Sequence, residues 1–293
     1  MNIYSPIHSV RLEQLTAHNV QLDIKRDDLI HPFISGNKWR KLKYMLQQAK
    51  QENKNVLVTF GGAYSNHLLA TATAGAIFGL KTIGIVRGEP VNNDTLFLCK
   101  LHGMELQFVS RDAYRNKREI FQALFNKNKQ AFFINEGGAG AEGAKGCSEI
   151  IQELTENYNH IFCAAGTGTT IAGILNGLTF TKKHSQVHVI PVLKDSEYLK
   201  ENINELLHKP ITFHFHKQYH FGGYAKTNVS LLNFITHFTQ QTGIMLDPIY
   251  TGKALFALFD LLQERFFNAE DKVLFIHTGG LFGTLGMKER FAF

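Results

Sequence analysis

The chain has 293 residues, of which 44% are hydrophobic and 19% are charged, and its formal net charge is +6. This length suits one large domain or two ordinary ones, and this composition excludes a chain that is disordered throughout. The basic residues are spread along the chain without a dense run, which suits a small anionic molecule at least as well as nucleic acid. We expect no nucleic-acid partner.

Short β-branched runs alternate with longer helical patterns along the chain. This rhythm is typical of parallel sheets with helices on both faces. The expected strands are residues 55–60, 81–86, 105–109, 131–134, 160–164, 187–193, 211–215 and 273–277. The expected helices are residues 66–78, 94–101, 114–126, 143–158, 171–178, 230–242 and 252–266, and a further helix begins near Lys38.

These elements predict an α/β fold with two open, mostly parallel sheets flanked by helices. We expect a small domain at residues 44–158 and a large domain formed by residues 1–43 and 159–293. No apolar run approaches the ~20 residues of a membrane-spanning helix, and the N-terminus does not resemble a signal peptide. The three cysteines form no C-x-x-C pair. We therefore expect a cytoplasmic protein without a membrane partner, a disulfide framework or a metal site.

A glycine-rich turn follows the strand predicted at residues 160–164. Gly166, Thr167, Gly168 and Thr169 open a helix, where unpaired N–H groups, the helix dipole and threonine hydroxyls favour a phosphate. The spacing lacks the lysine of the nucleoside-triphosphate loop and the last glycine of the dinucleotide motif. A single phosphate monoester is therefore the favoured ligand, although such turns also occur without any ligand.

Lys38 follows Ser35, Gly36 and Asn37, and either Ser35 or Asn37 can cap a helix that begins here. In the first turn its ammonium opposes the helix dipole, and burial would lower its pKa further toward the range of a nucleophile or base. By residue type alone, a solvated lysine among basic neighbours is the commoner outcome. The assignment of Lys38 therefore depends on the rest of the sequence.

Five blocks of sequence together resemble one known family. They read KRDDL at 25–29 with GNKWRKL at 36–42, FGGAYSNH at 60–67, GTGT at 166–169, DPIYTGK at 247–253 and HTGG at 277–280. In this order they resemble the signatures of the D-cysteine desulfhydrase and 1-aminocyclopropane-1-carboxylate deaminase family. The chain departs from that family at Tyr64, where glutamine is frequent, and at Cys147, where an aromatic residue is common.

The resemblance implies a tryptophan-synthase-β-like fold with pyridoxal 5'-phosphate held between two domains. Lys38 would form the Schiff base, and Asn66 would hydrogen-bond the phenolic oxygen of the cofactor. Ser65 would lie beside the α-carbon and carboxylate of the substrate, and Tyr250 would lie against the pyridine ring or near the substrate. The phosphate would be bound by Gly166, Thr167, Gly168 and Thr169. The pyridine nitrogen would lie near Thr251 and Thr278.

The residues around the pyridine nitrogen favour one reaction of this family over the other. The ring-opening deaminase carries a glutamate at the position of Thr251 and an apolar residue at that of Thr278. A carboxylate there keeps the ring nitrogen protonated and the ring a strong electron sink. The two neutral hydroxyls therefore favour β-elimination, most simply of D-cysteine to pyruvate, hydrogen sulfide and ammonia. Either Lys38 or Ser65 would carry the α-proton.

Three other readings stay open. In the favoured reading, the substrate is a small amino acid and the enzyme is a homodimer, as relatives of this family typically are. It could instead be a 1-aminocyclopropane-1-carboxylate deaminase, or a non-catalytic protein that binds pyridoxal phosphate or another phosphate ligand. A nucleotide-binding α/β protein is the remaining alternative, and it would stay colourless after purification.

Overall fold

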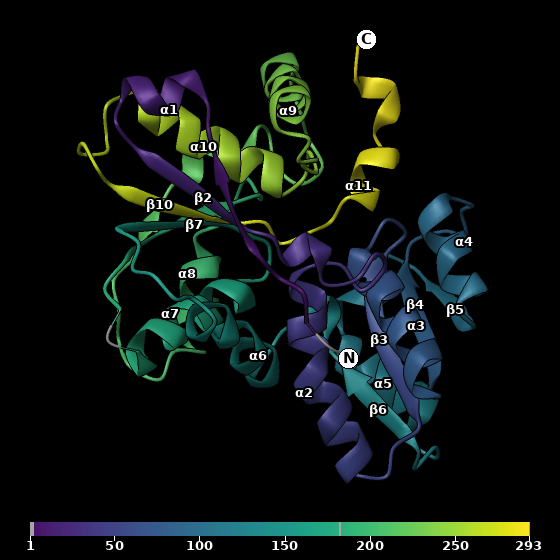
Figure 1. Ribbon diagram of the computed structural model, residues 1–293. Coiled ribbons are helices and arrows are strands. Elements are labelled where there is room, and N and C mark those ends of the chain that lie inside the picture. The colour runs from purple at the N-terminus through teal and green to yellow at the C-terminus, as the bar shows by residue number, and fades with distance from the viewer. Residues whose placement is uncertain (1–2, 182, 293) are drawn as a thin grey trace.

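The computed structural model of the chain describes residues 3–181 and 183–292. Figure 1 shows two lobes, each built on a sheet with helices packed on it. The larger sheet has the spatial order β1 (Ile7–Val10), β2 (Gln21–Lys25), β10 (Lys272–Ile276), β7 (His160–Ala165), β8 (Gln186–Pro191) and β9 (His214–Phe215). The strands β1 and β2 pair antiparallel, and all other neighbours in this sheet are parallel.

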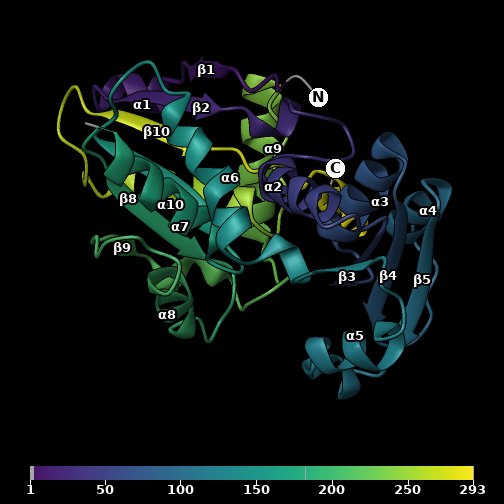
Figure 2. The same cartoon turned by 90° about the horizontal axis from the view of Figure 1, so that it is seen from below.

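The smaller sheet is entirely parallel. Its spatial order is β5 (Met104–Val109), β4 (Lys81–Arg87), β3 (Val56–Gly62) and β6 (Ala131–Ile134). The predicted α/β fold with two mostly parallel sheets is therefore confirmed. Seen from below in Figure 2, β4 and β5 lie at the outer side of this lobe, and the larger sheet lies across the molecule from them.

The helices cover both sheets, and none that the structure describes is long and apolar enough to cross a membrane. Their bounds are α1 (Glu13–Ala17), α2 (Asn37–Gln51), α3 (Asn66–Phe78), α4 (Asp94–Leu101), α5 (Lys117–Phe125), α6 (Ala141–Gln152), α7 (Thr169–Phe180), α8 (Tyr198–Asn204), α9 (Val229–Thr242), α10 (Thr251–Gln263) and α11 (Phe282–Leu285).

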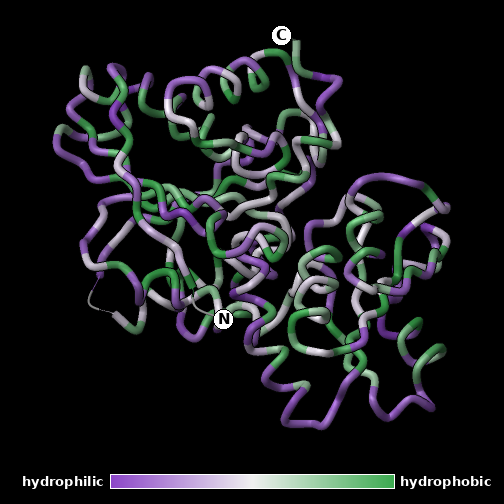
Figure 3. The backbone as a smooth tube through the Cα atoms, turned by 45° about the vertical axis from the view of Figure 1, so that its right-hand side comes forward, coloured by the Kyte–Doolittle hydropathy of each residue, from purple (hydrophilic) through white to green (hydrophobic). Residues whose placement is uncertain are grey.

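The central strands β7 and β10 of the larger sheet are buried on both faces, which explains their long apolar runs. Along β10, Val273 and Phe275 pack against α9 and α10, whereas Leu274 and Ile276 pack against α6 and α7. This alternation follows from side chains that point to opposite faces at successive strand positions. Figure 3 shows the outcome, with hydrophilic residues concentrated on the outer turns of both lobes.

Helix α6 lies within residues 44–158 but packs against the larger sheet's unit. Its buried side chains, among them Cys147 and Ile151, belong to the apolar cluster of β7 and α7. A Cβ atom at Gly173 of α7 would stand 2.4 Å from the Cβ of Cys147, so only glycine allows this close helix pairing. The strands β3 to β6 all lie within residues 44–158, whereas α6 shares its core with the flanking segments, and the division into two domains stays a prediction.

Three expected elements differ in extent. The strand expected at 211–215 pairs with β8 only at His214 and Phe215, because β9 is a short edge strand. The helix expected at 143–158 ends at Gln152, where the next residue, Glu153, is held by ion pairs. The helix expected at 114–126 is divided into a 3-10 turn and α5 at Asn116.

Candidate active site

A cavity of about 920 Å³ is lined by residues from both lobes. The loops that follow β3, β4 and β6 of the smaller sheet contribute Ser65, Gly88 and Glu136 to its wall. The loops that follow β7 and β10 of the larger sheet contribute Gly166 and Thr278. Ligands of open α/β sheets bind beyond the carboxyl ends of parallel strands, so this cavity is the expected position for a site.

Lys38 lines the cavity from the first turn of α2. Burial lowers the pKa of its ammonium to about 7, and the positive charge of Lys41 lowers it further in the same direction. The helix cap differs from the expectation, because the N-cap is Gly36 and no side chain caps the helix. A Cβ atom at Gly36 would overlap the carbonyl oxygen of Thr278, so the close approach of these two loops requires glycine.

The two side chains expected to cap α2 have other partners. Asn37 donates from Nδ2 to Oγ1 of Thr170 at 2.8 Å, which ties the start of α2 to the start of α7. Ser35 accepts at Oγ the N–H of Gly280 at 3.3 Å. Both contacts cross between segments far apart in sequence, so they hold the Lys38 turn in place against the larger sheet's loops.

The loop after β3 presents Ser65 and Asn66 to the cavity. Ser65 is the N-cap of α3, and its Oγ accepts the N–H of Leu68 at 3.4 Å. The backbone N–H groups of the first turn of α3 have no intrahelical partners and carry the positive end of the helix dipole. This loop can therefore hold a carboxylate group.

The glycine-rich turn also faces the cavity, through Gly166, Thr167, Gly168 and Thr170. Gly168 has a φ of 81°, which lets the chain turn sharply into α7. Thr169 is fully buried and its Oγ1 accepts from Thr167 at 3.3 Å, so its expected contact with a phosphate, through the backbone, stays a prediction.

Lys41 supplies a second buried cation at the cavity wall. Its side chain is only 3% exposed, and within the described residues its ammonium has no carboxylate partner and donates only to the carbonyl oxygen of Gly137, at 3.3 Å. Burial lowers the pKa of Lys41. A buried cation without a counter-charge is costly, and an anionic ligand in the cavity would offset that cost.

Tyr250 lines the cavity, and its ring lies against Gly166 and edge-to-face with Tyr224 at 6.1 Å between ring centres. A Cβ atom at Gly166 would stand 3.0 Å from the Tyr250 ring. Burial, followed by the proximity of Tyr224, raises the pKa of Tyr250 well above its ordinary value. Tyr250 therefore keeps its proton at neutral pH and can donate it.

The two threonines expected near a pyridine nitrogen occupy different environments. Thr278 lines the cavity at the end of β10. Thr251 is fully buried, and the carboxylate of Asp247 accepts its N–H and its hydroxyl, at 2.8 and 2.7 Å, at the start of α10. Its expected position near the pyridine nitrogen stays a prediction.

Several cavity residues lie outside the set that the sequence singled out. Arg87 and Glu136 directly follow or end predicted strands, so the rule that sites form beyond strand ends could have indicated them. Tyr224 lies in an irregular segment, and no sequence pattern marks it. Tyr64 lines the cavity and packs against Gly286 beyond α11.

The cavity offers a partner for each of the three parts of pyridoxal phosphate. The amine of Lys38, with a pKa of about 7, suits the aldehyde, and the ring of Tyr250 suits the pyridine ring. The glycine-rich turn at Gly166 and the buried cation of Lys41 suit the phosphate. A family model described as pyridoxal-phosphate dependent enzyme matches residues 3–279. The chain belongs to this family. It is therefore a pyridoxal-phosphate dependent enzyme, as the five sequence blocks predicted.

Relatives within this family carry names that state an activity. A putative 1-aminocyclopropane-1-carboxylate deaminase of Thermotoga maritima is 34% identical, over 96% of this chain and 94% of that protein. A bifunctional D-cysteine desulfhydrase/1-aminocyclopropane-1-carboxylate deaminase, mitochondrial, of Arabidopsis thaliana is 30% identical, over 95% and 77%. A crystal structure titled as an ACC deaminase homologue superposes with a TM-score of 0.88 at 29% identity, covering 98% of this chain and 92% of that one.

Proposed function

We propose that this enzyme catalyses β-elimination on a small amino acid, most simply D-cysteine plus water to pyruvate, hydrogen sulfide and ammonia. The observation that carries the proposal is the amine of Lys38, whose pKa is lowered to about 7, in a cavity shared with the Gly166–Gly168 turn. An amine that is neutral near pH 7 can attack an aldehyde and can also accept a proton.

Different residues of the cavity would bind different parts of the cofactor. Lys38 would attach to its aldehyde carbon, and the turn at Gly166 to Gly168 together with Lys41 would hold its phosphate. Asn66 would donate to its phenolic oxygen, and Thr278 would lie near its ring nitrogen. The chemistry that pyridoxal phosphate supplies when bound is an electron sink for the charge that develops at the α-carbon of an amino acid.

The remaining residues would position the substrate and move its protons. The first turn of α3, capped by Ser65, would hold the α-carboxylate. Lys38 would accept the α-proton, because its lowered pKa makes it a base near pH 7 whereas a serine hydroxyl is not one. Tyr250, which keeps its proton, would donate toward the leaving group.

Two features support elimination over ring opening. Thr278 offers a neutral hydroxyl to the cavity, and the hydroxyl of Thr251 is already bonded to Asp247. The ring-opening deaminase carries a glutamate at the position of Thr251, and this chain has no carboxylate there. The similar Arabidopsis thaliana protein is nevertheless named for both the desulfhydrase and the deaminase activity. The substrate panel therefore includes 1-aminocyclopropane-1-carboxylate.

The test begins with the purified holoenzyme. Its visible absorption band should disappear with borohydride, and mass spectrometry should then find the reduced cofactor on Lys38. A panel of D- and L-amino acids and 1-aminocyclopropane-1-carboxylate, assayed for oxoacid and sulfide, should show D-cysteine giving pyruvate. A labelled Lys38 without turnover of any member would overturn catalysis, and an unlabelled Lys38 would overturn the assignment of the amine.

The Ser65→Ala variant tests how the proton and the carboxylate are shared. We expect kcat/KM for D-cysteine to fall about tenfold through a higher KM, since one hydrogen bond to a charged group is lost. The cofactor should still attach to Lys38. If kcat falls a hundredfold while KM is unchanged, Ser65 carries the proton and our assignment to Lys38 is wrong.

The assembly state is also a proposal. We propose a homodimer, by similarity to relatives of this family. Light scattering of the holoenzyme measures its mass directly, and a mass near 33.1 kDa would indicate a monomer.

A further inference from the structure

The carboxyl edge of the smaller sheet carries a row of polar residues. Because its strands are parallel and ordered β5, β4, β3 and β6, the residues that end or follow them stand side by side. Arg111 follows β5, Arg87 ends β4, Ser65 follows β3 and Glu136 follows β6. All four line the cavity.

The side chain of Arg87 lies at this edge, near the loop that follows β3. In the pairing of β3 and β4, Gly62 stands opposite Arg87. A Cβ atom at Gly62 would lie 3.8 Å from Nη2 of Arg87, so the guanidinium lies over Gly62, three residues before Ser65. The central carbon of the same guanidinium lies 5.6 Å from the centre of the Tyr114 ring.

Arg111 reaches the same place from the neighbouring strand. A Cβ atom at Gly88 would lie 3.9 Å from Nε of Arg111, so this side chain folds back over the residue that follows Arg87. Neither arginine forms an ion pair with any residue that the structure describes. Two exposed guanidinium groups therefore border the cavity without a counter-charge.

The acidic residues of the cavity do not neutralise this pair. Glu136 pairs with Lys117 at 3.1 Å. Glu89 is exposed and forms no ion pair among the residues described in the structure. The cofactor's phosphate is assigned to the opposite wall, at the turn from Gly166 to Gly168, and the α-carboxylate to the first turn of α3. The two arginines are left with no anion of their own.

We propose that Arg87 and Arg111 form a subsite for a second anionic group on the substrate, so that the enzyme prefers amino acids whose β-substituent is negatively charged. Carboxylate, sulfonate and phosphate groups all fit, because a guanidinium binds planar or tetrahedral oxyanions through paired N–H donors. This subsite also suits a thiolate as it departs from D-cysteine. The proposal rests on the proposed function, which places the α-carboxylate at Ser65.

Aspartate and asparagine provide a matched pair of probes, since they have nearly the same size and differ in one charge. The holoenzyme is titrated with the D and L forms of each, and the dissociation constants are measured from the visible spectrum and by calorimetry. We expect aspartate to bind about tenfold more tightly than asparagine, the effect of one charge-assisted hydrogen bond. Added salt should weaken aspartate binding more than asparagine binding.

Variants then assign the preference to the arginines. Arg87→Gln and Arg111→Gln should each reduce the preference for aspartate, by roughly tenfold where one paired contact is lost. Arg115→Gln is the matched control, because that arginine is 81% exposed, pairs only with Asp112 and does not line the cavity. It should keep the wild-type preference.

Several results would overturn the subsite. One is equal binding of aspartate and asparagine by the wild type, and another is an unchanged preference for aspartate in both cavity variants. A third is an equal loss of affinity for both ligands in Arg87→Gln, which would place the α-carboxylate at Arg87. Failure of the proposed function looks different, because a holoenzyme that turns over no amino acid still reports the aspartate preference by calorimetry.

Discussion

Lys38 is the residue to which we assign the chemistry of this cavity, and its surroundings support the assignment. Lysine is normally a hydrated cation with a pKa near the middle of the alkaline range. At position 38, burial removes water and Lys41 adds a like charge, and both effects favour the neutral amine. Other lysines of the chain, such as Lys272 with its partner Glu156, keep their charge through ion pairs at the surface.

The lowered pKa of Lys38 makes cofactor loading dependent on pH. With a pKa of about 7, the fraction of neutral amine rises as the pH rises through 7. After the cofactor is removed, the rate of reattachment should increase between about pH 6 and 8 and then level off. Stopped-flow absorbance measures this rate. A rate that keeps rising to about pH 10 would show an ordinary lysine.

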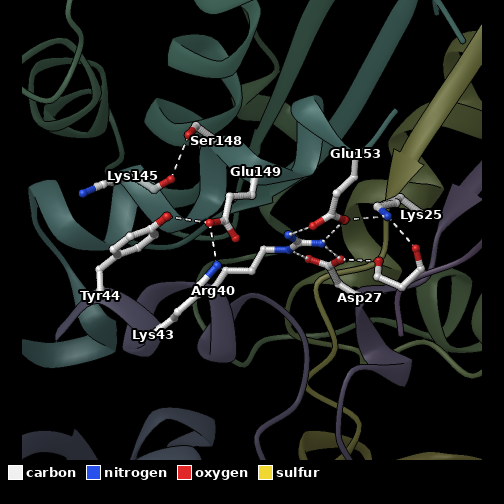
Figure 4. A network of polar contacts seen from close by, with 10 residues as sticks. Lys25, Asp27, Arg40, Lys43, Tyr44, Lys145, Ser148, Glu149 and Glu153 are labelled. Atoms are coloured by element: carbon white, nitrogen blue, oxygen red, sulfur yellow. Dashed lines mark hydrogen bonds and ion pairs between the residues drawn. The ribbon is translucent and has the colours of Figure 1, made fainter. Parts of the chain in front are cut away.

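At the scale of elements, a buried ion-pair network fixes the helix that carries Lys38. Figure 4 shows Arg40 of α2 between the carboxylates of Asp27 and Glu153. Its nitrogens lie 2.6 and 2.7 Å from Asp27 and 2.8 Å from both oxygens of Glu153, and Lys25 of β2 pairs with Glu153 at 2.9 Å. One turn away, Lys43 pairs with Glu149 of α6 at 2.7 Å.

This network predicts a large loss of stability on mutation of Arg40. Its side chain is fully buried, and so is that of Asp27. Arg40→Met would leave the Asp27 carboxylate buried without its partner, and we expect the free energy of unfolding to fall by about 3–5 kcal/mol. Urea denaturation measures it. Arg115→Met, at an exposed pair, should cost less than about 1 kcal/mol.

A ladder of histidines crosses three strands of the larger sheet. Nδ1 of His160 lies 3.0 Å from Nε2 of His188, and Nδ1 of His188 lies 2.9 Å from Nε2 of His216. His188 is fully buried and stacked on Phe162, with 4.2 Å between ring centres. Burial, followed by the neighbouring histidines, lowers the pKa of His188 to about 2. The ring is therefore neutral in the folded protein at neutral pH.

This neutral ladder predicts sensitivity to mild acid. Below about pH 6.5 the unfolded chain binds protons that folded His188 does not, so the free energy of unfolding should fall as the pH falls. His188 alone should contribute about 2 kcal/mol of loss between pH 7 and pH 5. Urea denaturation at several pH values measures this slope. His188→Phe should flatten it, whereas removal of the exposed His237 should not.

At the scale of the whole molecule, the cavity joins the two lobes. Ser65 and Asn66 come from the smaller sheet's unit, whereas Gly166, Tyr250 and Thr278 come from the larger one. A cofactor held by both groups of residues would add contacts between the lobes that the folded chain alone lacks. Binding to the folded state only stabilises it by mass action.

Removal of the cofactor should therefore lower the thermal stability of the protein. At a cofactor concentration about a hundredfold above its Kd, we expect the melting temperature of the holoenzyme to exceed that of the apoprotein by roughly 5–10 °C. Calorimetry of the hydroxylamine-treated and the reloaded protein measures the difference. Identical melting temperatures would contradict a cofactor that bridges the lobes.

Much of this architecture follows from local pattern. The strands of the smaller sheet and the helix at 94–101 were predictable because periodicity and turn residues act over a few positions. The strand β2 was not among the expected strands. The Gly166 turn was also found locally, since it stands at a helix terminus, whereas Lys38 and Ser65 were assigned from the resemblance of five ordered sequence blocks. The short strand β9 was not predictable, because its length depends on how β8 pairs with it.

Only the tertiary structure decided the partners of the polar groups. It turned Thr251 toward Asp247, and it placed Arg87 over Gly62 on an adjacent strand. The sequence by itself indicated most of the strands, helices and glycine-rich turns, because those depend on neighbouring residues. Burial, pKa shifts and ion pairs depend on residues distant in the chain, so they exist only once the chain has folded.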